Sequence, residues 1–362
     1  MLVVMDFFFA HCEETSKPSF KEKPLVVCVY SGRSEESGVV STANYIARKY
    51  GVKSGMPISL AKKKLNDKGA VFLPTDHILY DKVSNRIIAI LSSFADQFEK
   101  MGVDEAFLDV TQKVTEDFGK AEELAGEIKE NIKVKERMTC SIGVGPNKLV
   151  AKIAADFKKP DGLTIVKPEQ VKPFLFSLSV DKLIGVGKKT SEKMQELSIG
   201  TIGELAEYDP QKLIEFFGTK IGTYFHNAAN GIDEEEVRER GGAESIGRIT
   251  TLKEDTRDLN MIITRTDTLS EEVHTKVNSQ GLSFRTVGIV AIFEDLSNKS
   301  RVKSFQASTN ELTILKQTTR ELFEKLLEET ELKIRRTGVN VSNLTKVFSQ
   351  QKQMTDYFSN PK

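Results

Sequence analysis

The stretch Val103-Asp104-Glu105-Ala106-Phe107-Leu108-Asp109 places two adjacent carboxylates at the head of an apolar, β-prone run. Successive side chains of a strand point to opposite faces, so Asp104 and Glu105 can reach one metal ion only at a strand end or a hairpin bend. Adjacent acids in an apolar segment are costly to bury unless they bind a cation or a hydrogen-bond donor. The stretch therefore predicts a strand that begins at a metal site.

The composition is that of a soluble, folded protein with balanced charge. The 362 residues exceed the usual size of one domain, so we expect two to four domains. Lys+Arg and Asp+Glu both number 52, which argues against a nucleic-acid partner unless basic residues gather on one surface. The three cysteines lack metal-binding spacing and indicate a reducing compartment. The apolar start meets Asp6 too soon for a signal or membrane segment.

Strand and helix patterns alternate along the first part of the chain, which indicates an α/β layer. Strands are predicted at 1–9, 25–30, 103–109, 138–144 and 163–166, and helices at 42–50, 80–98, 119–132 and 148–157. Short helices with glycine turns follow to about 231, and the acidic stretch 231–244 is typical of a linker. A separate α+β unit is predicted after it, with strand patterns at 287–293 and 339–341, helical patterns at 259–278 and 308–330, and a polar tail expected to be disordered.

A glycine turn in the third quarter of the chain has the helix-hairpin-helix pattern. Leu183-Ile184-Gly185-Val186-Gly187 precedes a helix predicted over 190–197, and a second glycine turn follows at 198–205. Such glycines let backbone N–H groups approach a phosphate at a helix N-terminus, which is contact with a DNA backbone and not with its sequence. A weaker copy lies at 217–222. The alternative for either copy is a helix-packing turn without a ligand.

Other polar residues could serve the same chemistry. Asp6 follows a buried strand, and carboxylates from neighbouring strands suit Mg²⁺, which binds a few carboxylates together with substrate phosphates. A pair of such ions aligns the attacking and leaving oxygens of a phosphoryl transfer. Tyr45 and Arg48 lie three residues apart on one helix, so they share a face that could clamp a polyphosphate. Taken singly, these residues and Lys159 fit ordinary structural roles better.

Taken together and in order, these segments resemble the Y family of translesion DNA polymerases, in its archaeal polymerase IV-like branch. The matching stretches are STANYIARKYG (41–51), VDEAFLD (103–109), GVGPNKLVAKIA (143–154), KPDG (159–162) and IGVG (184–187). Residues 245–248 and 335–339 are similar to the two ends of the family's last folded domain. The resemblance covers nearly the whole chain, and the ordered set is far more specific than any single motif.

The resemblance implies an α+β multidomain, right-hand architecture. The palm would comprise 1–10 and 75–167, and small fingers would be inserted at 11–74. A helix-hairpin-helix thumb at 168–231 would be joined by a linker, 232–244, to an α+β little finger at 245–345. The last segment would be a tail, 346–362, that carries a clamp-binding peptide.

The resemblance also implies template-directed addition of deoxynucleotides to a primer 3′-OH with two Mg²⁺ ions, low fidelity and no proofreading. The metal ions would be held by Asp6, Asp104 and Glu105. The triphosphate would be held by Tyr45, Arg48 and Lys159, with the backbone of Phe7 and Phe8 close to it. Phe9, just before the small Ala10, would be the steric gate against ribonucleotides. The residues expected to contact DNA are Gly185, Gly187, Lys188, Arg301, Lys303, Arg335 and Arg336.

The first strand departs from the family pattern, which usually reads Asp-x-Asp before two aromatics and an alanine. Aligned without a gap, the family's metal-binding Asp falls on Val4, and Asp6 matches the second, non-ligand Asp. With a two-residue deletion, Asp6 is the metal ligand. We prefer the deletion because valine cannot bind Mg²⁺ and the other motifs are intact. The ungapped alignment would mean a weakened or inactive enzyme.

The tail resembles the peptide that docks on a sliding clamp. Gln351 is followed by Met354, Tyr357 and Phe358, which one helical turn would gather into an apolar plug. The alternative is an accidental pattern in a disordered tail. The implied partners are primer–template DNA, deoxynucleoside triphosphates and the clamp, for a cytoplasmic, monomeric enzyme without a membrane contact. The rival hypotheses are a non-catalytic DNA-binding protein of this fold, recruited by the clamp, and a helix-hairpin-helix nuclease that would not need Tyr45 and Arg48.

Overall fold

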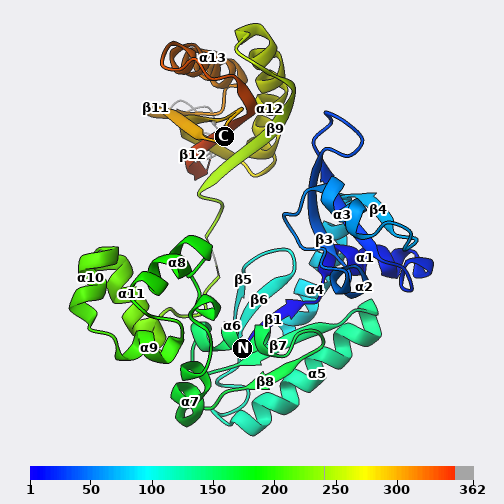
Figure 1. The fold of residues 1–362 in the computed structure, drawn as a ribbon, viewed down its shortest axis with the longest axis vertical. Coiled ribbons are helices and arrows are strands. Elements are labelled where there is room, and N and C mark those ends of the chain that lie inside the picture. Colours follow the sequence, from blue (N-terminus) through cyan, green and yellow to red (C-terminus); the bar gives the residue numbers. More distant parts are fainter. Residues whose placement is uncertain (240, 347–362) are drawn as a thin grey trace, which may run out of the picture. The chain divides into compact units, whose positions relative to one another are not determined.

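The computed structural model describes residues 1–239 and 241–346 (Figure 1). The chain divides into two compact units. Among the described residues, the first comprises Met1–Val29 and residues 40–239, and the second comprises Tyr30–Val39 and residues 241–346. Both units combine helices with sheets. None of the helices in the described part of the chain has the length and apolar character that crossing a bilayer requires.

A five-stranded sheet with the strand order β5-β6-β1-β7-β8 forms the centre of the first unit. Its strands are β1 (Leu2–Met5), β5 (Gln97–Lys100), β6 (Glu105–Asp109), β7 (Cys140–Val144) and β8 (Leu163–Ile165). Helices α1 (Phe8–Ser16), α4 (His77–Ser93) and α5 (Phe118–Glu136) share a core with the face that carries Val3 and Met5. Helix α6 (Lys148–Phe157) packs on the opposite face, against Leu2 and Val4. Both faces are buried, which explains the nearly continuous apolar runs in these strands.

Two predictions around the first strands were wrong at their ends. The strand predicted over 1–9 stops at Met5, because Phe7 adopts a left-handed backbone with φ of 37° and α1 begins at Phe8. The helix predicted over 42–50 begins only at Tyr45, because strand β3 (Gly38–Ala43) runs to Ala43. Asn44 then caps α2 (Tyr45–Lys49) by accepting a 3.0 Å hydrogen bond from the backbone N–H of Ala47. The helix predicted over 148–157 is confirmed as α6.

A small three-stranded sheet, in the order β3-β2-β4, lies between α1 and α4 in the sequence. It consists of β2 (Leu25–Tyr30), β3 and β4 (Val71–Pro74), with α2 and α3 (Ile58–Lys64) beside it and the short turn η1 (Pro18–Phe20) before it. Its own core includes Val26, Cys28 and Val40.

Residues 168–229 are helical. They form η2 (Pro168–Gln170), α7 (Val171–Phe176), η3 (Val180–Lys182), α8 (Lys188–Glu196), α9 (Ile202–Glu207), α10 (Pro210–Phe217) and α11 (Thr219–Ala229). These helices share one core with Leu149, Val150 and Ile153 of α6. The helical segment therefore packs directly on the edge of the helix that covers the five-stranded sheet.

Residues 231–237, which we call the strap, are bound to α6 although they were expected to belong to a linker. The side chain of Asn147 donates to the carbonyl of Gly231 at 2.8 Å, and Asp233 accepts from the backbone N–H of Leu149 at 2.9 Å. Lys148 forms a 2.9 Å ion pair with Glu235. The acids therefore satisfy the N-terminus of α6, where negative charge is favoured.

The second unit is built on a four-stranded antiparallel sheet with the order β11-β10-β12-β9. Its elements are β9 (Ser245–Thr256), α12 (Leu259–Ser279), β10 (Leu282–Phe293), β11 (Asn298–Thr309), α13 (Leu312–Glu328) and β12 (Ile334–Lys346). Both helices contribute to one core with the sheet. The strands are longer than the predicted 287–293 and 339–341, because their outer parts alternate between buried and exposed residues and lack a continuous apolar run.

Candidate active site

Asp104 and Glu105 lie where the sequence pattern predicts, at the bend between two antiparallel strands. Asp104 ends the turn after β5, and Glu105 is the first residue of β6. The backbone carbonyl of Asp104 accepts a 2.8 Å hydrogen bond from the N–H of Met5. Burial raises the pKa of Asp104, the charge of Glu105 raises it further, and Lys159 and Lys152 oppose the shift. The two acids therefore form a partly desolvated anionic pair.

Lys152 on α6 binds the second of these acids. Its ammonium lies 2.9 Å from Oε2 and 3.2 Å from Oε1 of Glu105, so one cation contacts both carboxylate oxygens. The ion pair is partly open to solvent, with the Lys152 side chain 30% exposed and that of Glu105 24% exposed. A cation thus already occupies a position on this carboxylate.

Asp6 is held in a different set of contacts. Its side chain is buried, and Oδ1 accepts from the hydroxyl of Ser141 at 2.8 Å. Oδ2 accepts from the hydroxyl of Thr139 and from the backbone N–H of Asp161, both at 2.8 Å. Within 1–239 and 241–346, no group of three or more His, Cys, Asp or Glu side chains is placed to hold a metal ion. The structure therefore brings Asp104 and Glu105 together and leaves Asp6 outside their group.

The register of β1 bears on the two alignments of the first strand. Val4 pairs directly with Glu105 of β6 and with Ser141 of β7. Directly opposed residues project to the same face of a sheet, so the side chain at position 4 shares the face of Glu105. Val4 itself is buried against α6, in a cluster with Leu2 and Ala151. Position 4 is therefore the β1 residue that pairs with Glu105, whereas position 6 lies beyond the end of β1.

Tyr45 and Arg48 lie together, as their spacing predicts. The guanidinium of Arg48 lies over the Tyr45 ring at 4.9 Å from its centroid, and its Nε donates to the carbonyl of Ala43 at 2.8 Å. The ring of Phe7 meets the Tyr45 ring edge to face at 5.2 Å. Burial raises the pKa of Tyr45 and the charge of Asp6 adds to the shift, so the phenol stays protonated and available as a donor.

Lys159 is also near the carboxylates. It forms a 2.6 Å ion pair with Asp156, one turn before it in the sequence, and its charge lowers the pKa of Asp104. Its partner is exposed, so the pair resembles the surface ion pairs that are easily exchanged for another anion.

The three phenylalanines after Asp6 occupy different environments. Phe7 precedes α1 and stacks on His11, and no side chain caps the helix after it. Phe8 is buried in the core. Phe9 stacks on Tyr80 of α4 with ring centroids 4.3 Å apart and also meets the ring of His77. The aromatic support under Phe9 comes from α4.

The first glycine turn has the geometry expected of a helix-hairpin-helix element. Gly185 has a φ of 87°, a conformation that favours glycine, and Gly187 lies immediately before α8, whose first residue is Lys188. The Tyr224 hydroxyl donates to the carbonyl of Ile184 at 2.9 Å and ties the turn to α11. The second copy is Gly218, with a φ of 83°, between α10 and α11.

The basic residues predicted to contact DNA in the second unit are mostly paired with acids. Lys303 bonds Glu321 of α13 at 2.7 Å, and Arg301 bonds Glu329. Arg335 bonds Asp255 at 3.0 Å, and Asp255 also receives a hydrogen bond from Arg33 at 2.5 Å. These residues do not form one unpaired basic face, and Arg336 is on the strand directly after Arg335. The predicted clamp-binding residues lie outside the described residues.

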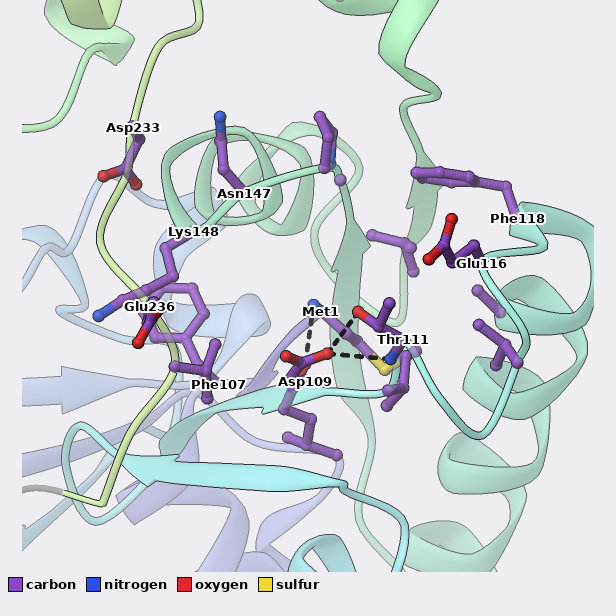
Figure 2. A pocket seen from close by; sticks show the side chains of 18 of the residues that line it. Met1, Phe107, Asp109, Thr111, Glu116, Phe118, Asn147, Lys148, Asp233 and Glu236 are labelled. Carbon is purple, nitrogen blue, oxygen red and sulfur yellow. Dashed lines mark hydrogen bonds between the residues drawn. The ribbon is translucent and has the colours of Figure 1, made fainter.

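A cavity of about 450 Å³ lies elsewhere in the first unit, beneath the strap (Figure 2). Phe107, Val114 and Phe118 provide apolar walls, and acids of the strap and the aliphatic part of Lys148 line the other side. Asp109 lines it too but is already an acceptor for the N–H and the hydroxyl of Thr111. Asp104 and Glu105 do not line this cavity, so it is separate from the carboxylate pair.

Sequence reasoning missed several residues that complete the site. Lys152 stands four residues after Lys148, a spacing that places both on one face of α6, and this signal could have pointed to acids facing that helix. Thr139, just before β7, and Ser141, in β7, are two residues apart, and both hydroxyls donate to Asp6. Tyr80 lies in an ordinary amphipathic helix pattern and gave no signal.

Comparison with known proteins shows which family models and which relatives the chain matches. The model of the impB/mucB/samB family matches residues 3–156, that of its C-terminal domain matches 243–355, and that of the DNA polymerase-iota thumb domain matches 181–233. The chain is 46% identical over 355 residues to DNA polymerase IV of Nitrosopumilus maritimus, with 98% of this chain and 97% of the relative covered. It is 42% identical to DNA polymerase IV of Metallosphaera sedula over 346 residues, with 96% and 97% covered.

Solved structures agree with these relatives. A Y-family DNA polymerase chimera, Dbh-Dpo4(243-245)-Dbh, matches with a TM-score of 0.90 and 36% identity, covering 96% of this chain and 99% of that chain. The insertion ternary complex of Dbh DNA polymerase matches with a TM-score of 0.69 at the same identity and coverage.

Proposed function

Because the chain belongs to the impB/mucB/samB family of Y-family DNA polymerases, we propose that Asp104 and Glu105 hold the metal ions of its reaction. The protein is a translesion DNA polymerase, and its substrates are DNA and deoxynucleoside triphosphates. The relatives and the solved structures favour this activity over the two alternatives, a non-catalytic DNA-binding protein and a nuclease.

Divalent metal ions are used by Y-family DNA polymerases, and the carboxylate pair fits them. Carboxylate oxygens are ligands that Mg²⁺ prefers, and the Lys152 ammonium on both oxygens of Glu105 marks a cation position. We propose two Mg²⁺ ions, which when bound align the attacking and leaving oxygens of the transfer. The protein's own contribution is a pair of fixed oxygen ligands at a rigid strand end.

Asp6 is the predicted ligand whose contacts support the role least. As a third ligand it would exchange the hydroxyls of Thr139 and Ser141 for the metal ion. In the ungapped alignment Val4 takes the ligand position, and Asp6 only joins β7 to the turn at Asp161. Asp6→Asn separates these roles, because asparagine still accepts a hydrogen bond but lacks the charge. We expect a loss of at least about 100-fold in primer extension if Asp6 is a ligand, since the neutral amide no longer offsets the charge of the metal ion.

The other proposed contacts are with the triphosphate of the incoming nucleotide. Arg48 is held by Ala43 and by the Tyr45 ring, so its remaining guanidinium donors and the phenol can face phosphate oxygens. Lys159 can leave its exposed partner Asp156 for the same purpose. The backbone at Phe7 and Phe8 begins a helix that no side chain caps, which suits an anion.

Phe9 is proposed as the steric gate. Its stacking on Tyr80 fixes the ring, so a 2′-hydroxyl would meet a surface that cannot move away. Phe9→Ala is expected to raise ribonucleotide incorporation relative to deoxynucleotide incorporation. Single-nucleotide insertion assays with paired ribo- and deoxynucleotides measure this ratio, and an unchanged ratio with intact deoxynucleotide insertion would remove the assignment.

Further roles are proposed for the helical segment and the second unit. The turn at Gly185 and Gly187, with Lys188, would hold the DNA backbone. Arg336 would contact DNA, and so would Arg301, Lys303 and Arg335 once their acidic partners are displaced. The tail residues 351–358 would dock on a sliding clamp. We further propose a monomeric, cytoplasmic enzyme that lacks proofreading.

One observation supports the active-site proposal most directly. The Asp104–Glu105 pair lies at a strand end, and the Lys152 ammonium already contacts Glu105. Primer extension with Mg²⁺ and four deoxynucleotides tests it, with wild type beside Asp104→Ala and Asp6→Ala. Wild type is expected to extend the primer, and Asp104→Ala to lose at least about 100-fold in rate. Activity retained in Asp104→Ala would remove this residue from the metal site. Incubation of labelled DNA with Mg²⁺ and no nucleotide provides the control for nuclease action.

A further inference from the structure

We propose that Lys152 is a positioning residue for Glu105 that competes with the divalent metal ion for the same carboxylate. The ammonium holds Glu105 in place while no metal ion is bound, and it withdraws when the carboxylate binds a metal ion through both oxygens. This inference rests on the proposed role of Glu105 in the metal site.

The geometry places one cation where another would bind. The Lys152 ammonium contacts both oxygens of Glu105, at 2.9 Å and 3.2 Å, so a metal ion that binds both oxygens has to displace it. A metal ion on the same carboxylate would lie close to the ammonium, and two positive charges repel each other more strongly in a partly desolvated site than in water. Binding of a divalent ion to Glu105 and retention of the Lys152 contact are therefore mutually opposed.

The backbone that carries Lys152 is fixed, so the movement must come from its side chain. Helix α6 lies directly on β7, where a Cβ at Gly143 would overlap the backbone of Ala151 and Ala155. The neighbours of Lys152 on the helix, Ala151 and Ile153, are buried. The position of the Lys152 Cα is therefore constant, while its flexible four-carbon stem sets the position of the ammonium.

The exposure of Lys152 gives its ammonium room to withdraw. Its side chain is 30% exposed, whereas Lys148, one turn earlier on α6, is 6% exposed and bonded to Glu99 and Glu235. Lys148 is thus enclosed by two acids and serves the strap. Lys152 contacts solvent on one side and a single acid on the other, which is the arrangement that an exchangeable counterion requires.

Charge balance gives the contact a purpose before the metal ion binds. Asp104 and Glu105 are adjacent acids, and like charges at neighbouring positions repel each other. The Lys152 ammonium on Glu105 offsets that repulsion until a metal ion replaces it. The Lys159 ammonium is instead bonded to Asp156.

Calorimetric titration of the full-length chain with Mn²⁺, without nucleotide or DNA, tests the competition. Lys152→Met keeps the length of the stem and removes the charge, so Mn²⁺ is expected to bind about 3- to 10-fold more tightly than to wild type. Lys152→Arg retains the cation and is expected to bind Mn²⁺ as wild type does. Lys316→Met is the matched control, because Lys316 has a similar exposure and a 2.6 Å bond to Glu271 in the second unit.

Single-nucleotide insertion measured as a function of metal ion concentration provides a second readout. Lys152→Met is expected to reach its half-maximal rate at a metal ion concentration about 3- to 10-fold lower than wild type does, and Lys152→Arg at the wild-type concentration. Lys152→Gln, measured in parallel, replaces Lys152→Met if that variant does not fold. An unchanged or weaker Mn²⁺ affinity in the uncharged variant, or an equal gain in Lys316→Met, overturns the inference.

Asp104→Ala separates this inference from the active-site proposal. If Asp104→Ala loses Mn²⁺ binding while Lys152→Met shows no gain in affinity, the metal site stands and the competition is refuted. If Asp104→Ala binds Mn²⁺ as wild type does, the metal ion is not at this pair and both proposals fail.

Discussion

The two units both pack helices on a sheet and both contain lysine–glutamate pairs, but these pairs lie in different environments. In the first unit the Lys148 and Glu99 side chains are only 6% and 2% exposed. In the second unit the side chains of Lys303 and Glu321 are 47% and 36% exposed. The two pairs have the same ammonium-to-carboxylate distance, 2.7 Å.

Equal distances do not mean equal energies, because the surroundings set the cost of separating the charges. An exposed pair exchanges one set of hydrogen bonds for another with water, so breaking it changes little. A buried carboxylate that loses its counterion stays desolvated. The comparison predicts that α6 depends on its charges for stability, whereas α13 depends on its apolar face.

Thiol reactivity tests the burial of the first unit and should show the largest effect. All three cysteines are buried in the first unit, and burial raises the pKa of the Cys12 and Cys140 thiols to about 12. Because the thiolate is the reactive form, we expect modification by a thiol reagent at pH 8 to be at least about 1,000-fold slower in the native protein than in urea. A rapidly modified thiol in the native chain would show that the first unit opens locally.

Lys148→Met should have the next largest effect. The substitution removes the Lys148 cation from buried Glu99 and releases Glu235 of the strap, so we expect a loss of about 3–5 kcal/mol in the free energy of unfolding. Urea denaturation followed by circular dichroism measures it. The double variant Lys148→Met/Glu99→Leu should recover much of the loss, and a single variant as stable as wild type would contradict the comparison.

Two glycines provide a third test, one at a helix–sheet contact in the first unit and one between strands of the second unit. Gly143→Ala would place a methyl group onto the backbone of α6, which cannot move, so we expect a loss of about 3 kcal/mol, the upper end for overpacking. Gly288→Ala in β10 meets only the Asn340 side chain, which can turn away, and should lose less than about 1 kcal/mol. Thermal unfolding of both variants gives the difference, and equal losses would refute the distinction.

Lys303→Met should have the smallest effect. Its partner Glu321 stays hydrated, and Gln317 also donates to it, so we expect a change within about 0.5 kcal/mol. The same urea titration as for Lys148→Met makes the two values directly comparable. A loss above about 2 kcal/mol here would mean that the pair contributes far more than its exposure allows.

The parts of the fold that the sequence predicts well are those with a single local cause. Helix α6 was predicted residue for residue because an asparagine cap and an unbroken apolar pattern define it. The turn of Phe7 and the early start of α1 were missed because a run of phenylalanines fits a strand and a buried helix equally well. The Asp104–Glu105 bend was predicted because two adjacent acids in an apolar strand are too costly to bury away from a cation or a donor.

The contacts between distant residues were the part that the sequence could not provide. The bond between Lys152 and Glu105 joins residues 47 positions apart, and the donors to Asp6 come from β7 and from the turn at Asp161. Local patterns predict which face a residue occupies but not which residue of another element faces it. The same limit explains why the strap was predicted as a linker, since acidic composition alone does not reveal the helix end that it satisfies.

The strap also determines where a segment of this protein can be joined to a segment of a relative to make a hybrid. By composition, a junction would be placed before Gly231, at the first acidic residues. A hybrid joined there would receive foreign residues in place of Asp233 and Glu235, and the start of α6 would lose both partners. A junction after Val237 keeps these partners with the helix that they bind. The domain boundary for such hybrids should therefore lie within the acidic stretch, after Val237, and not before Gly231.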